Sequence, residues 1–187
     1  MWTTILLIIL AAIIIFTPII LYNRLVRLKN QVENAWRQID VQLKRRTDLI
    51  PNLIETVKGY VKHERETLDS VTQARAAVMD ARKGSSDPKK AAQADNMLSS
   101  TLKSLFAVAE SYPDLKANQN FLQLQEELSG TENKIAAARQ YYNDMVMAFN
   151  TRIESFPDMI FAGIFNFTKK DLFEADEEDK KNIKVKF

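Results

Sequence analysis

The sequence predicts an all-α protein, in which an N-terminal transmembrane helix is followed by an elongated antiparallel up-and-down bundle of three to four long helices. An uncharged aliphatic run opens the chain. Beyond it, apolar residues recur every seven positions through most of the sequence, a repeat typical of helices that pack along a common seam. Turn-forming residues are few, with 4 Gly and 5 Pro in 187 residues, which favours long elements.

The N-terminal run predicts a transmembrane anchor over residues 1–23. No Lys, Arg, Asp or Glu precedes Arg24, and residues 5–21 are almost wholly aliphatic. In a helix, about 18–20 such residues cross a bilayer core of about 30 Å. A cleaved secretory signal is the competing interpretation, but the segment has no basic start and no small-x-small cleavage motif. We therefore expect an uncleaved anchor.

The charges beside the run predict its orientation. Arg24, Arg27 and Lys29 directly follow the aliphatic segment, whereas no charged side chain precedes it. Basic residues next to a membrane span stay on the cytoplasmic side. We therefore expect the N-terminus outside the cell and the C-terminal domain in the cytoplasm.

A helical bundle domain is predicted over residues 24–157. Its first helix is expected to continue from the membrane to about Lys83, because two rows of mostly apolar residues share the seven-residue spacing. These rows are Leu25, Val32 and Ile39, and Trp36, Leu43, Ile50, Val57, Val71 and Val78. The spacing continues through Pro51, which favours a kinked continuous helix; a turn at Pro51, giving four segments, is the alternative.

Two more helices are predicted in this domain. Asp87 is placed to cap the second, with Pro88 in its first turn, and Pro113 interrupts it. The last helix is expected from about Asn118 and ends at Pro157. Its apolar residues repeat every seven positions, at Phe121, Leu128, Ile135, Tyr142, Phe149 and Phe156.

Residues 158–187 form a C-terminal tail of changed composition. Residues 160–167 are apolar and aromatic, residues 171–179 are mostly acidic, and residues 183–187 alternate between apolar and basic as a strand does. A lone strand leaves its backbone groups unpaired. We therefore expect this end to pair with a neighbouring subunit or partner protein; a frayed terminus is the alternative.

The composition offers little for catalysis or for nucleic-acid binding. The net charge of +2 is too small for a nucleic-acid-binding surface, and cysteine is absent. His63 is the only histidine, and it lies in no two-histidine zinc motif. We therefore predict no catalytic, cofactor-binding or metal-binding residues and no cofactor.

Four charged residues interrupt or adjoin the apolar rows. Arg46 and Glu64 occupy otherwise apolar positions, and Arg139 adjoins the last row, with Glu132 one or two turns earlier. An ionic pocket that binds a ligand is one interpretation. We favour the other, in which these residues pair across helices and determine how the helices align.

Several motifs resemble those of the LemA family of bacterial membrane proteins, and the match covers nearly the whole chain. They are YNRLV (22–26), NAWRQIDVQLKRR (34–46), DLIPNL (48–53), ESYP (110–113), LKAN (115–118), TENKI (131–135), ARQ (138–140) and YND (142–144). Thr47 departs from the pattern, standing where an aromatic residue is common.

The resemblance implies a membrane-anchored helical bundle with no established enzymatic activity. It also implies association with membrane metalloproteases, and magnetosome formation in relatives. No catalytic residue is carried over, because the family has none defined. We therefore predict a non-enzymatic single-pass protein of the bacterial inner membrane that acts as a scaffold, adaptor or self-assembling platform. A regulatory partner subunit of a membrane enzyme such as a metalloprotease is the alternative.

The expected partners follow from this prediction. They are the lipid bilayer and either further copies of the chain or another membrane protein. Neither nucleic acid nor a small-molecule substrate is expected.

Overall fold

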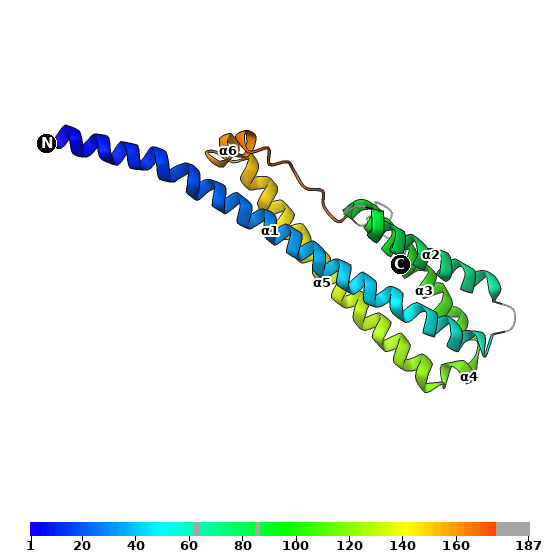
Figure 1. The fold of residues 1–187 in the computed structure, drawn as a ribbon. Helices are drawn as coiled ribbons and strands as arrows, with labels where there is room; N and C mark the ends of the chain where they lie inside the picture. The colour runs from blue at the N-terminus through cyan, green and yellow to red at the C-terminus, as the bar shows by residue number, and fades with distance from the viewer. Residues whose placement is uncertain (62–63, 85–86, 175–187) are drawn as a thin grey trace, which may run out of the picture. The chain divides into compact units, whose positions relative to one another are not determined.

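The computed structural model describes residues 1–61, 64–84 and 87–174. All regular secondary structure in these residues is helical, which confirms the predicted all-α class (Figure 1). Their six helices are α1 (Trp2–Lys58), α2 (Arg65–Gly84), α3 (Pro88–Ala109), α4 (Pro113–Lys116), α5 (Gln119–Glu154) and α6 (Asp158–Ile164).

The chain divides into two compact units, which we describe separately. The first unit contains residues 1–36 and 141–170. The second contains residues 37–140 and, within the described part of the tail, residues 171–174.

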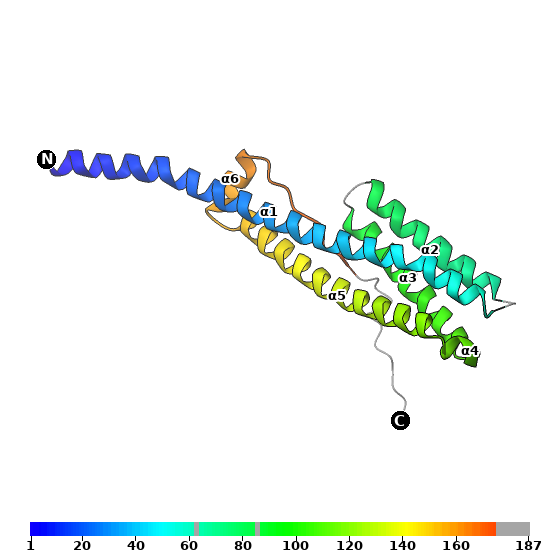
Figure 2. The same cartoon turned by 60° about the horizontal axis from the view of Figure 1, so that its bottom comes forward.

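The second unit is a bundle of the C-terminal part of α1, α2, α3 and the N-terminal part of α5. Contacts between α1 and α2 run in opposite order along the two helices: Asp40 pairs with Arg82, and Thr47 with Arg75. These two helices are therefore antiparallel. Figure 2 shows α2 beside α3, and both helices contribute to the core. Buried core residues include Ile39, Leu43, Ile50, Leu53, Val57, Val71, Val78, Leu98, Leu105, Phe121, Leu128 and Ile135.

α1 is continuous through Pro51, as the unbroken apolar spacing predicts, but it does not reach Lys83. It ends at Lys58, and the amides of Tyr60 and Val61 both donate to the carbonyl of Val57 in the following turn. Gly59, next to the end of α1, is a poor helix former, which favours the stop there. The sequence predicts one helix to about Lys83 where the structure has two, α1 and α2. Both helices face the same core and carry the same apolar repeat, so the repeat does not reveal the turn between them.

Pro51 is accommodated by a side chain from α2. Proline has no amide hydrogen, so in a helix the carbonyl four residues earlier loses its backbone donor. That carbonyl belongs to Thr47, whose residue is buried, and Arg75 Nε of α2 donates to it at 2.9 Å. A hydrogen bond between helices therefore replaces the one that proline removes from α1.

The start of α3 matches the sequence prediction. The Asp87 carboxylate accepts hydrogen bonds from the backbone amides of Lys89 and Lys90, at 3.1 and 3.4 Å, and Pro88 lies in the first turn. The helix ends at Ala109, and Pro113 begins the separate short helix α4. The cap therefore satisfies two of the amides that a helix start leaves without a partner.

In the first unit, the predicted row of α5 is buried at Tyr142 and Phe149, but Phe156 is 78% exposed. Placing Phe156 in the seam was therefore wrong. The helix ends at Glu154, and the residue before a proline is biased toward extended backbone, which takes Phe156 out of the helical row. Phe149 packs instead against Phe167, with ring centroids 6.3 Å apart.

After α6 the chain returns to α5. Asn166 adopts a positive φ of 55°, and the amide of Phe167 donates to the carbonyl of Ala162. Asn150 then both donates to and accepts from the backbone of Lys170, at 2.9 Å each. Residues 175–187, which include the predicted strand, lie outside the described residues.

Candidate functional site

A buried ion pair lies in the core of the second unit. Arg46 of α1 is 1% exposed and Asp95 of α3 is 2% exposed. Arg46 Nη1 donates to Asp95 Oδ1 at 2.8 Å and to Ser99 Oγ at 2.9 Å. Removing two charges from water is costly, so such a pair persists only where hydrogen bonds compensate for the lost solvation.

Two side chains of α5 complete this ionic cluster. Glu132 Oε2 lies 3.5 Å from Arg46 Nη2, and Arg139 Nη1 lies 3.9 Å from Asp95 Oδ2. The Arg139 guanidinium also lies over the ring of buried Phe173, 4.7 Å from its centroid. Three helices and the described end of the tail therefore contribute to one cluster.

Helical spacing explains why these side chains meet. Arg46 lies seven residues after Ile39 and seven before Leu53, so all three face the core. Asp95 likewise lies between Leu98 and Ala91 on the buried side of α3. Two oppositely charged residues on apolar stripes thus face each other across the bundle.

Burial raises the pKa of Asp95 above its ordinary value of 3.8. The charges of Arg46 and Arg139 oppose this effect, and the charge of Glu132 adds to it. Desolvation dominates because it penalises the ionised carboxylate directly.

The structure brings together three of the four charged residues singled out in the sequence. Arg46, Glu132 and Arg139 belong to the cluster, whereas Glu64 lies apart and accepts a hydrogen bond from the Tyr112 hydroxyl at 3.5 Å. Sequence reasoning missed Asp95 and Ser99. The available signal was that Asp95 lies on the apolar side of α3, with Ser99 four residues later on the same face of the helix. His63 lies outside the described residues.

This cluster has the chemistry of a structural contact. Its two buried charges compensate each other, and its hydrogen bonds join α1 to α3. In the described part of the chain, no group of three His, Cys, Asp or Glu side chains is placed to hold a metal ion.

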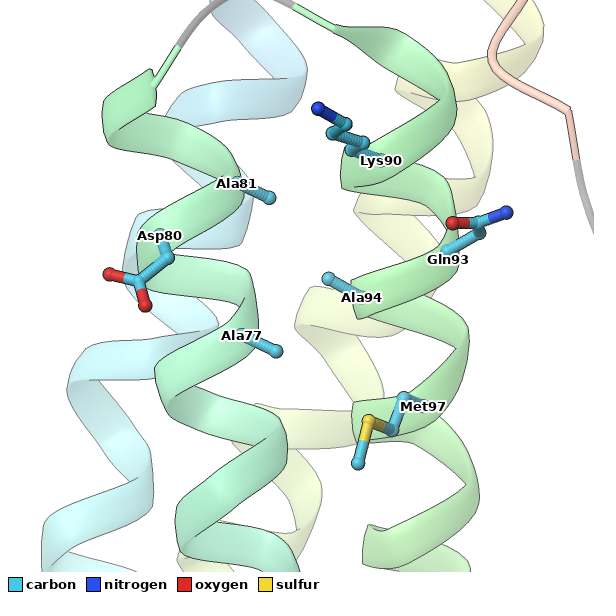
Figure 3. Close-up of a pocket in the computed structure, with 7 residues that line it drawn as sticks. All are labelled: Ala77, Asp80, Ala81, Lys90, Gln93, Ala94 and Met97. Atoms are coloured by element: carbon cyan, nitrogen blue, oxygen red, sulfur yellow. The ribbon is translucent and has the colours of Figure 1, made fainter.

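A separate hollow of about 510 Å³ lies between α2 and α3. Figure 3 shows Ala77 and Ala81 of α2 and Ala94 and Met97 of α3 pointing toward the space between the helices. The carboxylate of Asp80 and the amide of Gln93 point away from it (Figure 3). The side chain of Lys90 also extends from α3 toward this space (Figure 3). The hollow is therefore formed mainly by methyl and thioether groups, which pack against a neighbour, with one amine at its edge.

Comparison with known proteins assigns the chain to a protein family. The model of the LemA family matches residues 35–187. The chain belongs to the LemA family. The match begins at Ala35 and includes all residues of the ionic cluster.

The chain is also similar to individual proteins. The chain is 29% identical over 161 residues to Protein LemA of Metamycoplasma hominis, covering 86% of this chain and 72% of that protein. It is 22% identical over 182 residues to the magnetosome proteins MamQ 1 and MamQ 2 of Paramagnetospirillum magneticum, covering 86% of this chain and 67% of each of them.

Proposed function

We propose that this LemA-family protein is a non-enzymatic scaffold or adaptor held in the cell membrane by the N-terminal part of α1. The observation that carries the proposal is the exposure of this apolar segment. Its most apolar 18-residue window has a mean hydropathy of 3.0 and is 6% buried. Soluble monomeric proteins rarely expose so large a continuous apolar surface, whereas a bilayer solvates it.

The second unit supports a binding role rather than a catalytic one. Its charged core residues Arg46 and Asp95 pair with each other. Four of the seven residues that line the α2–α3 hollow are alanine or methionine, and the others are Asp80, Lys90 and Gln93. A bundle of this kind presents fixed helical faces to other proteins. In this proposal α1 carries the bundle at the membrane surface, where it assembles with further copies or with a membrane protein.

The proposed topology places the N-terminus outside and the large domain in the cytoplasm, because Arg24, Arg27 and Lys29 follow the apolar segment. We expect alkaline phosphatase fused after Phe187 to be inactive and a fluorescent protein fused there to be bright. Replacing the three basic residues with Gln and placing three Lys before Ile5 is expected to weaken or reverse this result. Active phosphatase on the unaltered chain would contradict the topology.

The proposed scaffold role is tested by crosslinking the full chain in intact cells, followed by purification in detergent and identification of the products. Products that contain further copies of the chain support a self-assembling platform. A single enzyme captured at a fixed stoichiometry supports the alternative, a regulatory subunit. A chain that crosslinks only to lipid, at native expression, would overturn both.

A matched pair of variants controls for nonspecific capture in this experiment. Ala81→Arg fills the α2–α3 hollow, and Gln73→Arg places the same charge at an exposed position on α2. A product that both variants retain maps to another face of the bundle. A product that both lose reflects added charge rather than a specific surface.

A further inference from the structure

The first unit exposes a group of large apolar side chains around α6. Their exposed fractions run from 47% to 78%. They are Phe156, Met159, Ile160, Ile164 and Phe165. Contiguous exposed apolar residues of this size mark a surface that contacts something other than water.

The three of these side chains that belong to α6 share one side of the helix. At 100° per residue, Met159, Ile160 and Ile164 fall within one broad face of the helix. Asp158 and Ala162 lie on the opposite face and are buried, with Asp158 Oδ2 3.5 Å from Arg152 Nε of α5. α6 is therefore amphipathic, docked through one face and exposed through its apolar face.

α6 lies beside the N-terminal part of α1 (Figures 1 and 2). Tyr22 directly follows Leu21, the last residue of that run. The centroid of the Tyr22 ring is 4.6 Å from the ring centroid of Phe165 and 6.1 Å from that of Phe167. If α1 spans a bilayer to Leu21, these contacts place α6 at the level of the lipid headgroups.

Positive charge gathers in the same unit. A hollow of about 510 Å³ between α1 and α5 is lined by Arg24, Arg27 and Arg152, with the hydroxyls of Thr151 and Ser155 beside them. Arg152 also forms an ion pair with Asp158. Arg24 and Arg27 form no ion pair within residues 1–61, 64–84 and 87–174. Guanidinium groups and hydroxyls are suited to bind phosphate oxygens.

We propose that the apolar face of α6 lies in the interfacial layer of the bilayer, with Arg24, Arg27 and Arg152 binding the phosphates of anionic lipids. This inference rests on the membrane anchoring proposed above. It adds a second membrane contact, made by a segment more than 130 residues away in sequence. Interfacial helices combine these features, an apolar face with basic residues near the headgroups.

The absence of cysteine from the chain allows a direct test. Ile160→Cys, Ile14→Cys and Met97→Cys are each labelled with an environment-sensitive fluorophore on the full chain. Ile14 marks the apolar run and Met97 an exposed position on α3, and all three side chains are 45% exposed or more. The proteins are reconstituted into vesicles of phosphatidylcholine and phosphatidylglycerol, with or without a nitroxide quencher near the headgroup end of the acyl chains.

We expect the label at Ile160 to lose most of its emission to the quencher, and the label at Met97 to lose little. Quenching at Ile14 but not at Ile160 would overturn the inference and leave the anchor intact. No quenching at Ile14 would overturn the anchor itself.

The role of the arginines is tested in the same vesicles. We expect quenching at Ile160 to increase with the phosphatidylglycerol content, and Arg24→Gln with Arg27→Gln to abolish that increase. Quenching at Ile160 that does not depend on anionic lipid would overturn the phosphate contacts. Arg37→Gln, at an exposed position on α1, controls for a general loss of positive charge.

Discussion

Replacing Asp95 with Ala is expected to lower the free energy of unfolding by about 3–5 kcal/mol, because it leaves the Arg46 charge buried without its main partner. Urea unfolding of the full chain in detergent, followed by circular dichroism, measures this loss. A loss below about 1 kcal/mol would show that solvent or a ligand compensates Arg46, which would favour the ionic pocket over the structural pair.

A double replacement separates stability from alignment of the helices. Arg46→Met with Asp95→Leu removes both charges, and such exchanges are often neutral or stabilising by about 1–4 kcal/mol. We therefore expect the double variant to recover most of the stability that Asp95→Ala loses. If the pair determines how α1 and α3 align, the double variant will unfold less cooperatively despite this recovery.

The pH dependence of stability gives an independent check. Because burial raises the pKa of Asp95, the folded protein binds this proton more tightly than the unfolded chain. The contribution of Asp95 to stability therefore falls as the pH rises from 3.8 through its raised folded value, by about 1.4 kcal/mol per unit of pKa difference. Asp95→Asn removes this titration, so the stability of the unaltered protein relative to this variant should decline over that interval.

Replacing Phe149 with Ala is expected to destabilise the first unit by about 3–5 kcal/mol. Phe149 is 1% exposed and packs against Phe167, so truncation leaves a cavity where the returning tail meets α5. Thermal unfolding of the full chain, with hydrogen exchange to locate the change, measures the effect.

Asp144→Ala serves as the control for this variant, since it changes an exposed residue of the same helix. We expect it to alter stability by no more than about 0.5 kcal/mol. Asn150 is unsuitable as a control because its side chain holds the backbone of Lys170. Equal small effects of Phe149→Ala and Asp144→Ala would mean that the apolar seam is not packed as described.

Periodicity predicts much of this fold because burial selects apolar residues at helical spacing. Ile39, Val71 and Leu128 are buried as their rows predict, whereas Phe156, the last member of the α5 row, is exposed. The turn after Lys58 was missed because both helices that flank it follow one repeat. Sequence reasoning expected Arg46 to pair across helices, but its partner Asp95 could not be identified, because the choice of partner depends on how two distant helices align.

The hydrogen bond from Arg75 to the Thr47 carbonyl has a consequence for folding. Pro51 cannot donate to the Thr47 carbonyl, so α1 lacks this hydrogen bond until α2 packs against it and Arg75 supplies the donor. Opening α2 would remove this donor from the Thr47 carbonyl, so a state in which α1 forms without α2 lacks one protein hydrogen bond. We therefore expect α2 and the part of α1 around Pro51 to unfold together, because a proline couples the two helices.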